Sequence, residues 1–164
     1  MLRILDIIGD TMVDGPGFRT SIYCAGCNHR CPGCHNPQSW NFGGGHEVSE
    51  DYIMSIIKAD KYADVTFSGG DPMYQAKGFA HLAKRIKEET GKNIWCYTGF
   101  TFEGLKGTQR DLLKYIDVLV DGPYIEKLRD EDLLFRGSSN QRLIDVKASL
   151  EQGKAVLFNP NVKI

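Results

Sequence analysis

Short apolar segments with strand-like and helix-like spacing alternate along most of the chain. Residue types favoured in strands predict strands at 18–24, 64–68, 93–97 and 117–120, with weaker signals at 142–146 and 155–158. Apolar residues three and four positions apart predict helices after a cap at Ser49, around 79–86, around 112–116 and around 147–152. Alternating elements of this kind form right-handed βαβ units, so we predict an α/β fold with a mostly parallel sheet and flanking helices.

The chain length limits the form of that sheet. We find no linker or repeat in the 164 residues, so we predict a single domain over residues 1–164. A closed eight-stranded barrel usually needs about 200 residues, which favours an open sheet or a partial barrel. The connection from Ala25 to about Glu47 is much longer than a usual loop, and such loops are commonly functional.

Glycine is abundant, and much of it lies directly after predicted strands. The chain has 18 glycines, a share well above the usual value of about 7%. Glycine turns follow four strands at Gly26, Gly69-Gly70, Gly99 and Gly122. Ligands of parallel α/β proteins bind at the carboxyl ends of the strands, where glycine allows close approach to backbone. Each glycine could equally serve only a tight turn.

Charge and hydropathy exclude several classes of protein. Mean hydropathy is −0.32, and no apolar run approaches the roughly 18 residues of a membrane span. Asp6 lies too early for a secretory signal. The formal charge of −1 argues against a broad nucleic-acid surface. Four of the five cysteines lie between Cys24 and Cys34, which is typical of a reduced, metal-using cytoplasmic protein rather than a disulfide scaffold.

The central motif is C-x3-C-x2-C, formed by Cys27, Cys31 and Cys34 on the loop after the first predicted strand. Three thiolates on a four-iron cluster leave one iron open, as a catalytic metal site requires. Adding Cys24 would give a closed four-thiolate site for zinc or electron transfer. Cys24 lies on the strand pattern, however, where a free cysteine is usually a small buried hydrophobe, and we expect the same of Cys96.

Two segments of the chain resemble motifs of the radical S-adenosylmethionine (SAM) enzymes. They are the three-cysteine motif and Ser68-Gly69-Gly70-Asp71-Pro72. Further segments narrow the resemblance to glycyl-radical-enzyme activases that act on anaerobic ribonucleoside-triphosphate reductase. They are Asp14-Gly15-Pro16-Gly17, Cys31-Pro32-Gly33-Cys34-His35-Asn36, Trp95-x-Tyr97-Thr98-Gly99, Asp121-Gly122-Pro123 and Arg136-Gly137-Ser138-Ser139-Asn140-Gln141. The resemblance covers residues 10 to 145 approximately and implies an open partial (β/α) barrel of the radical SAM type.

The resemblance also implies a mechanism. Cys27, Cys31 and Cys34 would hold a 4Fe-4S cluster, whose open iron would bind the amino and carboxylate groups of SAM. Reductive cleavage would give a 5′-deoxyadenosyl radical, which would abstract hydrogen from a backbone glycine of the reductase. The electron would come from a donor such as reduced flavodoxin. The cofactors carry the hard chemistry, so no proton-transfer residue is needed.

The resemblance further implies SAM-binding residues, which are Gly33, Cys34, His35, Gly69, Gly70 and Asp71. Gly69 and Gly70 would place backbone against the methionine moiety. Asp71 would accept a hydrogen bond from the ammonium group of SAM, or simply cap the next turn. Gly33 and His35 would lie along adenine, although His35 could also be a surface residue.

For other polar residues the sequence allows two roles, one in binding and one in the structure or on the surface. Arg136, Asn140 and Gln141 either position SAM or the partner's glycine loop, or satisfy backbone groups in a buried turn. The charge run 126–132 faces the reductase or is a solvated surface. The remaining histidines and one arginine are expected to be solvated or capping rather than ligands; they are His29, Arg30, His46 and His81.

Three other functions remain open at this point. The chain could activate another glycyl-radical enzyme, such as pyruvate formate-lyase. It could also be a small radical SAM enzyme that acts on a metabolite. In a different class, it could be a non-catalytic zinc or iron–sulfur module.

Overall fold

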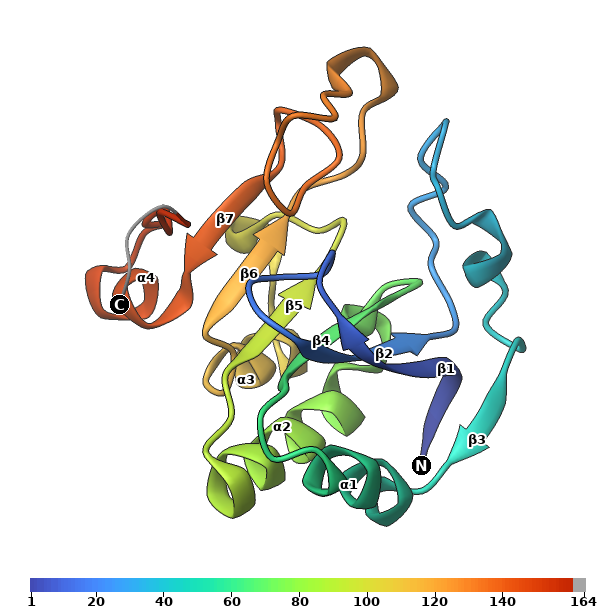
Figure 1. Cartoon of the computed structure of the whole chain (residues 1–164). Coiled ribbons are helices and arrows are strands. Elements are labelled where there is room, and N and C mark those ends of the chain that lie inside the picture. The colour runs from blue at the N-terminus through green and yellow to red at the C-terminus, as the bar shows by residue number, and fades with distance from the viewer. Residues whose placement is uncertain (161–164) are drawn as a thin grey trace.

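A computed structural model describes residues 1–160 and contains one seven-stranded sheet with helices packed on it (Figure 1). The strands are β1 (Leu2–Thr11), β2 (Arg19–Cys24), β3 (His46–Val48), β4 (Asp64–Gly69), β5 (Ile94–Tyr97), β6 (Val118–Asp121) and β7 (Arg142–Asp145). The α-helices are α1 (Glu50–Ala59), α2 (Ala76–Thr90), α3 (Thr108–Leu113) and α4 (Val146–Gln152). Short 3-10 helices are η1 (Pro37–Trp40), η2 (Pro72–Gln75), η3 (Phe102–Gly104) and η4 (Glu126–Leu128).

The sheet is mixed, with parallel strands at its centre. Its order is β3-β1-β2-β4-β5-β6-β7. β2, β4, β5 and β6 are mutually parallel, while β1 and β7 run antiparallel to their neighbours. Within residues 1–160 the sheet is open, with β3 and β7 at its edges. The carboxyl ends of the four parallel strands therefore meet along one side, as the predicted βαβ units require.

The sequence patterns did not predict two of the strands, β1 and β3, and predicted one strand, at 155–158, that is not formed over that length. β1 pairs with β2 through two register shifts, near Ile4 and near Thr11. Such irregularities break the period-two alternation by which a strand is recognised. β3 has only three residues. The strand expected at 155–158 is reduced to a single bridge between Leu157 and Ile144.

One face of the sheet packs against α1, α2 and α3 (Figure 1). Ile22 of β2, Phe67 of β4 and Leu119 of β6 are completely buried against helix residues such as Phe79 and Leu112. α1 begins at the expected cap, because the Ser49 hydroxyl accepts a hydrogen bond from the Tyr52 amide. The burial of this apolar face fixes the parallel strands and, with them, the position of their carboxyl ends.

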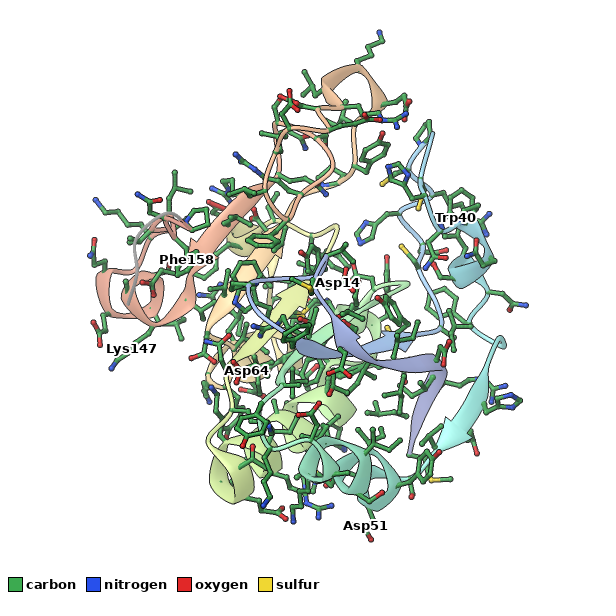
Figure 2. All side chains as sticks on the ribbon, in the orientation of Figure 1. Asp14, Trp40, Asp51, Asp64, Lys147 and Phe158 are labelled. Atoms are coloured by element: carbon green, nitrogen blue, oxygen red, sulfur yellow. The ribbon has the colours of Figure 1, made fainter. Side chains whose placement is uncertain are left out.

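The other face of the sheet is covered by the loop between β1 and β2, on which Figure 2 labels Asp14. Beneath it, Arg19 is 1% exposed and donates to the Thr66 hydroxyl and to the Val65 carbonyl. Burial lowers the pKa of Arg19 to about 10. β2 is thus buried on both faces rather than on one, and Phe18, expected on its apolar face, is exposed just before it.

Among the described residues, no helix combines the length and apolar character that crossing a bilayer would require.

Candidate metal centre

The three cysteines of the C-x3-C-x2-C motif line one cavity at the carboxyl ends of the parallel strands. The cavity has a volume of about 180 Å³. Its wall also includes residues that end or follow β4, follow β5 and β6, or precede β7; they are Gly69, Gly70, Thr98, Gly99, Gly122 and Gln141. Figure 1 shows the loops after β2 and β6 extending from this same side of the sheet. The fold therefore brings together segments that are separated by more than a hundred residues.

The loop that carries the cysteines is held by its own backbone. Gly26 and Cys27 donate to the carbonyls of Ser39 and Trp40, so the start of the loop pairs with η1 (Figure 2 labels Trp40). The Cys34 amide donates to the Cys31 carbonyl at 3.1 Å, which closes a turn. These contacts keep the three thiols on one short stretch of ordered backbone.

The five cysteines divide into two groups by burial, and all are free thiols. Cys27, Cys31 and Cys34 are partly exposed in the cavity wall, whereas Cys24 and Cys96 are 0% exposed in the helix-side core. Burial raises the pKa of the Cys24 and Cys96 thiols, which therefore stay neutral. The prediction that these two thiols pack in the core is confirmed, and Cys24 contributes nothing to the cavity wall described here.

The donor set of the cavity suits an iron–sulfur cluster with one site left for another ligand. Three cysteines line the same wall, and thiolates are the ligands of such clusters. Burial raises the pKa of Cys27, so metal binding there must displace a proton. The Tyr97 hydroxyl, in the same wall, is buried with no hydrogen-bond partner within residues 1–160. A buried polar atom of this kind indicates a missing polar partner such as a bound ligand.

Gly69 and Gly70 allow the end of β4 to lie against the start of the cysteine loop. Gly69 has φ +106°, and a Cβ there would overlap the backbone of Cys24. A Cβ on Gly70 would lie 2.5 Å from the Gly26 carbonyl oxygen. Both glycines also line the cavity, as a backbone contact with SAM would require, and that contact stays a prediction.

Asp71 caps the following turn, which was one of its two expected roles. Its Oδ1 accepts from the Met73 amide at 2.9 Å. Its Oδ2 accepts from the Thr98 hydroxyl, the Gly99 amide and the Nε2 of His29. The carboxylate is 1% exposed, and these four donors use most of its lone pairs. Contact with the ammonium group of SAM stays a prediction.

His29 differs from its expected role as a solvated or capping residue. Its side chain is only 16% exposed, and its ring lies in the cavity wall. The signal available in the sequence was its place between Cys27 and Cys31, although that alone does not indicate a buried partner. A sulfur, a ring nitrogen and a carboxylate oxygen of Cys27, His29 and Asp71 lie within 4.8 Å of one another.

Gly33 and His35 lie outside the wall of this cavity. The His35 ring contacts the Tyr124 ring, with centroids 5.2 Å apart. A Cβ on Gly33 would overlap the carboxylate of Glu126, which accepts a hydrogen bond from the Tyr124 hydroxyl. Both residues thus join the cysteine loop to the segment after β6, and their contact with adenine stays a prediction.

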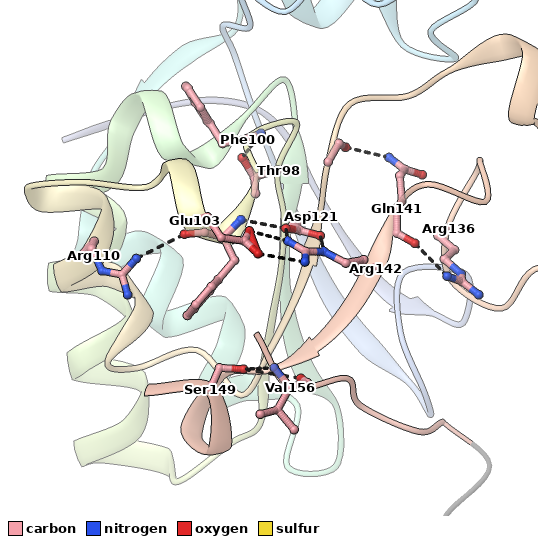
Figure 3. Close-up of polar contacts among 12 residues, drawn as sticks. Thr98, Phe100, Glu103, Arg110, Asp121, Arg136, Gln141, Arg142, Ser149 and Val156 are labelled. Atoms are coloured by element: carbon pink, nitrogen blue, oxygen red, sulfur yellow. Dashed lines mark hydrogen bonds and ion pairs between the residues drawn. The ribbon is translucent and has the colours of Figure 1, made fainter. Parts of the chain in front are cut away.

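The segment from Arg136 to Gln141 satisfies backbone groups, one of its two expected readings (Figure 3). The Gln141 side chain donates its Nε2–H to the Gly122 carbonyl and accepts at Oε1 from the Gly137 backbone amide, and the Asn140 side chain donates to the Pro123 carbonyl. Gln141 nevertheless also lines the cavity. The charge run after Tyr124 is exposed, as a solvated surface would be.

Comparisons with known proteins agree with this geometry. Residues 13–144 match a family model described as "4Fe-4S single cluster domain". An anaerobic ribonucleoside-triphosphate reductase-activating protein of Vibrio cholerae is 42% identical over 138 residues, which are 79% of this chain and 89% of that protein. Proteins of the same name from Escherichia coli K12 and phage T4 are 37% and 36% identical, over 79% and 80% of this chain and 90% and 86% of their own lengths.

A solved structure supports the fold. The crystal structure of QueE from Escherichia coli has a TM-score of 0.52 and 14% identity, covering 73% of this chain and 69% of that one. At this identity the likeness concerns the fold alone. With three cysteines in one cavity, a matching cluster domain and relatives of one name over most of its length, the chain belongs to the family of anaerobic ribonucleoside-triphosphate reductase-activating proteins.

Proposed function

We propose that this chain, acting as one domain over residues 1–164, is a radical SAM enzyme that activates an anaerobic ribonucleoside-triphosphate reductase. One observation carries the proposal: the three partly exposed thiols share their cavity with the Gly69-Gly70 backbone at the carboxyl ends of parallel strands. The names of the family members support the reductase as the target.

The chain's own residues would prepare the site for two cofactors. Cys27, Cys31 and Cys34 would hold the 4Fe-4S cluster, and because they are three, one iron stays free for SAM. When bound, these cofactors supply a 5′-deoxyadenosyl radical by one-electron cleavage of SAM. Gly69 and Gly70 would present backbone to the methionine moiety, and the surrounding wall would limit access of water to the radical.

The substrate in this proposal is a peptide loop of another protein. The radical would take one hydrogen atom from a backbone glycine of the reductase, giving 5′-deoxyadenosine and a glycyl radical. An open sheet, of the partial-barrel form expected for radical SAM enzymes, suits such a substrate because, within the described part of the chain, its edge strands do not pair with each other to close a barrel. The electron for SAM cleavage would come from a donor such as reduced flavodoxin.

The test is a reaction of the anaerobically reconstituted chain with SAM, a reductant and the purified reductase. We expect 5′-deoxyadenosine and an electron paramagnetic resonance (EPR) signal of a glycyl radical on the reductase, both absent with Cys31→Ala. A radical formed only on pyruvate formate-lyase would move the assignment to that activase. A chain that binds zinc but no iron and sulfide would refute the radical SAM function altogether.

A further inference from the structure

One carboxylate joins three segments that meet at the metal centre. Asp71, which follows β4, accepts from the Thr98 hydroxyl and the Gly99 amide after β5, each at 2.9 Å. The same oxygen accepts from His29 Nε2 at 2.7 Å, and His29 belongs to the cysteine loop after β2. The carboxylate is 1% exposed, so these contacts are shielded from water.

The His29 ring is also fixed by packing. Its centroid lies 4.5 Å from that of Phe100, edge to face, and 5.6 Å from that of Tyr74. A Cβ on Gly99 would lie 2.6 Å from the His29 ring, so the glycine gives the ring its space. Packing on these sides and a charge-assisted hydrogen bond at Nε2 together determine where the ring sits.

This ring lies at the centre of the C-x3-C part of the motif. It is two residues from Cys27 and two from Cys31, and its Nε2 gives this loop a side-chain hydrogen bond to Asp71, just after β4. We propose that His29 is a positioning residue that fastens the cysteine loop to Asp71 and thereby sets the place of the three thiols relative to the Gly69-Gly70 backbone. This inference rests on the proposed function, since that backbone is where SAM would bind.

The test compares two substitutions of the same residue. In His29→Gln, the side-chain amide places an N–H close to the position of Nε2 and keeps the hydrogen bond to Asp71. His29→Leu keeps apolar volume and loses the donor. His81→Leu is the matched control, because His81 Nδ1 lies 2.6 Å from Glu50 Oε2 in a similar pair that is exposed and remote from the cavity.

The first measurement is hydrogen exchange on the metal-free chain. We expect amides of the cysteine loop and of Gly99 to exchange about tenfold faster in His29→Leu, from loss of a buried hydrogen bond to a charged group. The second measurement is the EPR spectrum of the reduced cluster with and without SAM. We expect His29→Leu to need about tenfold more SAM for the spectral change, and His29→Gln and His81→Leu to resemble the wild type.

Two outcomes would overturn the inference. One is unchanged exchange in the cysteine loop of His29→Leu. The other is a SAM-dependent spectrum of His29→Leu that equals the wild type, even if its thermal stability is lower, since a purely structural role would affect stability alone. Failure of the proposed function is separate: it would appear as a wild-type chain that produces no 5′-deoxyadenosine.

Discussion

Arg142, at the start of β7, forms a bidentate ion pair with Asp121, at the end of β6 (Figure 3). Its Nε lies 3.0 Å from Asp121 Oδ1 and its Nη2 lies 2.6 Å from Oδ2. The same guanidinium also reaches both oxygens of Glu103, and these carboxylates raise the pKa of Arg142. Because Asp121 is 1% exposed, this pair anchors the antiparallel edge strand directly beside the Gly122 turn of the cavity.

Arg142→Met is therefore expected to destabilise the chain. The variant leaves the Asp121 carboxylate buried with the Phe102 amide as its remaining donor among residues 1–160. Leaving a buried carboxylate without its charged partner costs about 3 kcal/mol in free energy of unfolding. Urea denaturation of the metal-free chain measures this loss. Arg129→Met, which removes an exposed contact with Glu131, is the control and should change stability by less than about 0.5 kcal/mol.

Substitution of single cysteines should separate cluster ligands from packed thiols. Cys27→Ala, Cys31→Ala and Cys34→Ala should each lose most of the iron and sulfide bound after anaerobic reconstitution. Cys24→Ala should keep them, because that thiol is buried on the helix side of the sheet. Iron and sulfide analysis decides the matter. If Cys24→Ala loses the cluster as completely as Cys31→Ala, the site has four protein ligands and the open-iron proposal fails.

The buried thiols predict a loss of stability in alkali. The pKa values of Cys24 and Cys96 are raised in the folded chain, so their thiols remain neutral at a pH where those of the unfolded chain ionise. The stabilisation that comes from these raised pKa values is complete below a pH of about 9. Above that pH the free energy of unfolding decreases by about 1.4 kcal/mol per pH unit for each thiol. Urea denaturation between pH 8.5 and 10 gives the free energy of unfolding at each pH. This free energy should fall less steeply with pH in Cys96→Val than in the wild type. An identical dependence on pH would contradict the assignment of Cys96 as a buried neutral thiol. At pH 7 the thiols are neutral in both states, so the difference in stability measured there is due to the change in packing alone.

Gly70→Ala should disturb the junction between β4 and the cysteine loop. The new methyl group would lie 2.5 Å from the Gly26 carbonyl oxygen, so backbone must move, at a cost of about 2 kcal/mol. The free energy of unfolding, measured by urea denaturation, and the iron bound after reconstitution should both decrease. Gly9→Ala is the control, since a Cβ there meets no atom within 4 Å. Equal stability of the two variants would show that the close approach is relieved without cost.

Tyr97→Phe should stabilise the metal-free chain and weaken ligand binding. The hydroxyl is buried without a partner among residues 1–160, so its removal should add about 1 kcal/mol to the free energy of unfolding. If SAM supplies the missing partner, its dissociation constant should rise about fivefold in the variant. Tyr62→Phe, at a residue that is 91% exposed, should alter neither quantity. A Tyr97→Phe chain with unchanged SAM binding would assign the hydroxyl to another ligand.

The sequence by itself determined the local features. The spacing of Cys27, Cys31 and Cys34, the cap at Ser49 and the buried thiols Cys24 and Cys96 all followed from residue type and period. The order of strands and helices was also readable, because apolar periodicity reflects which face of each element is buried.

Only the tertiary structure decided which polar groups meet. The irregular β1 was invisible to a period-two pattern, and its pairing and the loop after it explain why Arg19 is buried. The contacts of Asp71 with His29 and Thr98 join residues 42 and 27 positions apart, and such contacts depend on the register of neighbouring strands. Sequence pattern reports burial of a face, whereas the partner of a buried polar atom is set by how the ends of strands align.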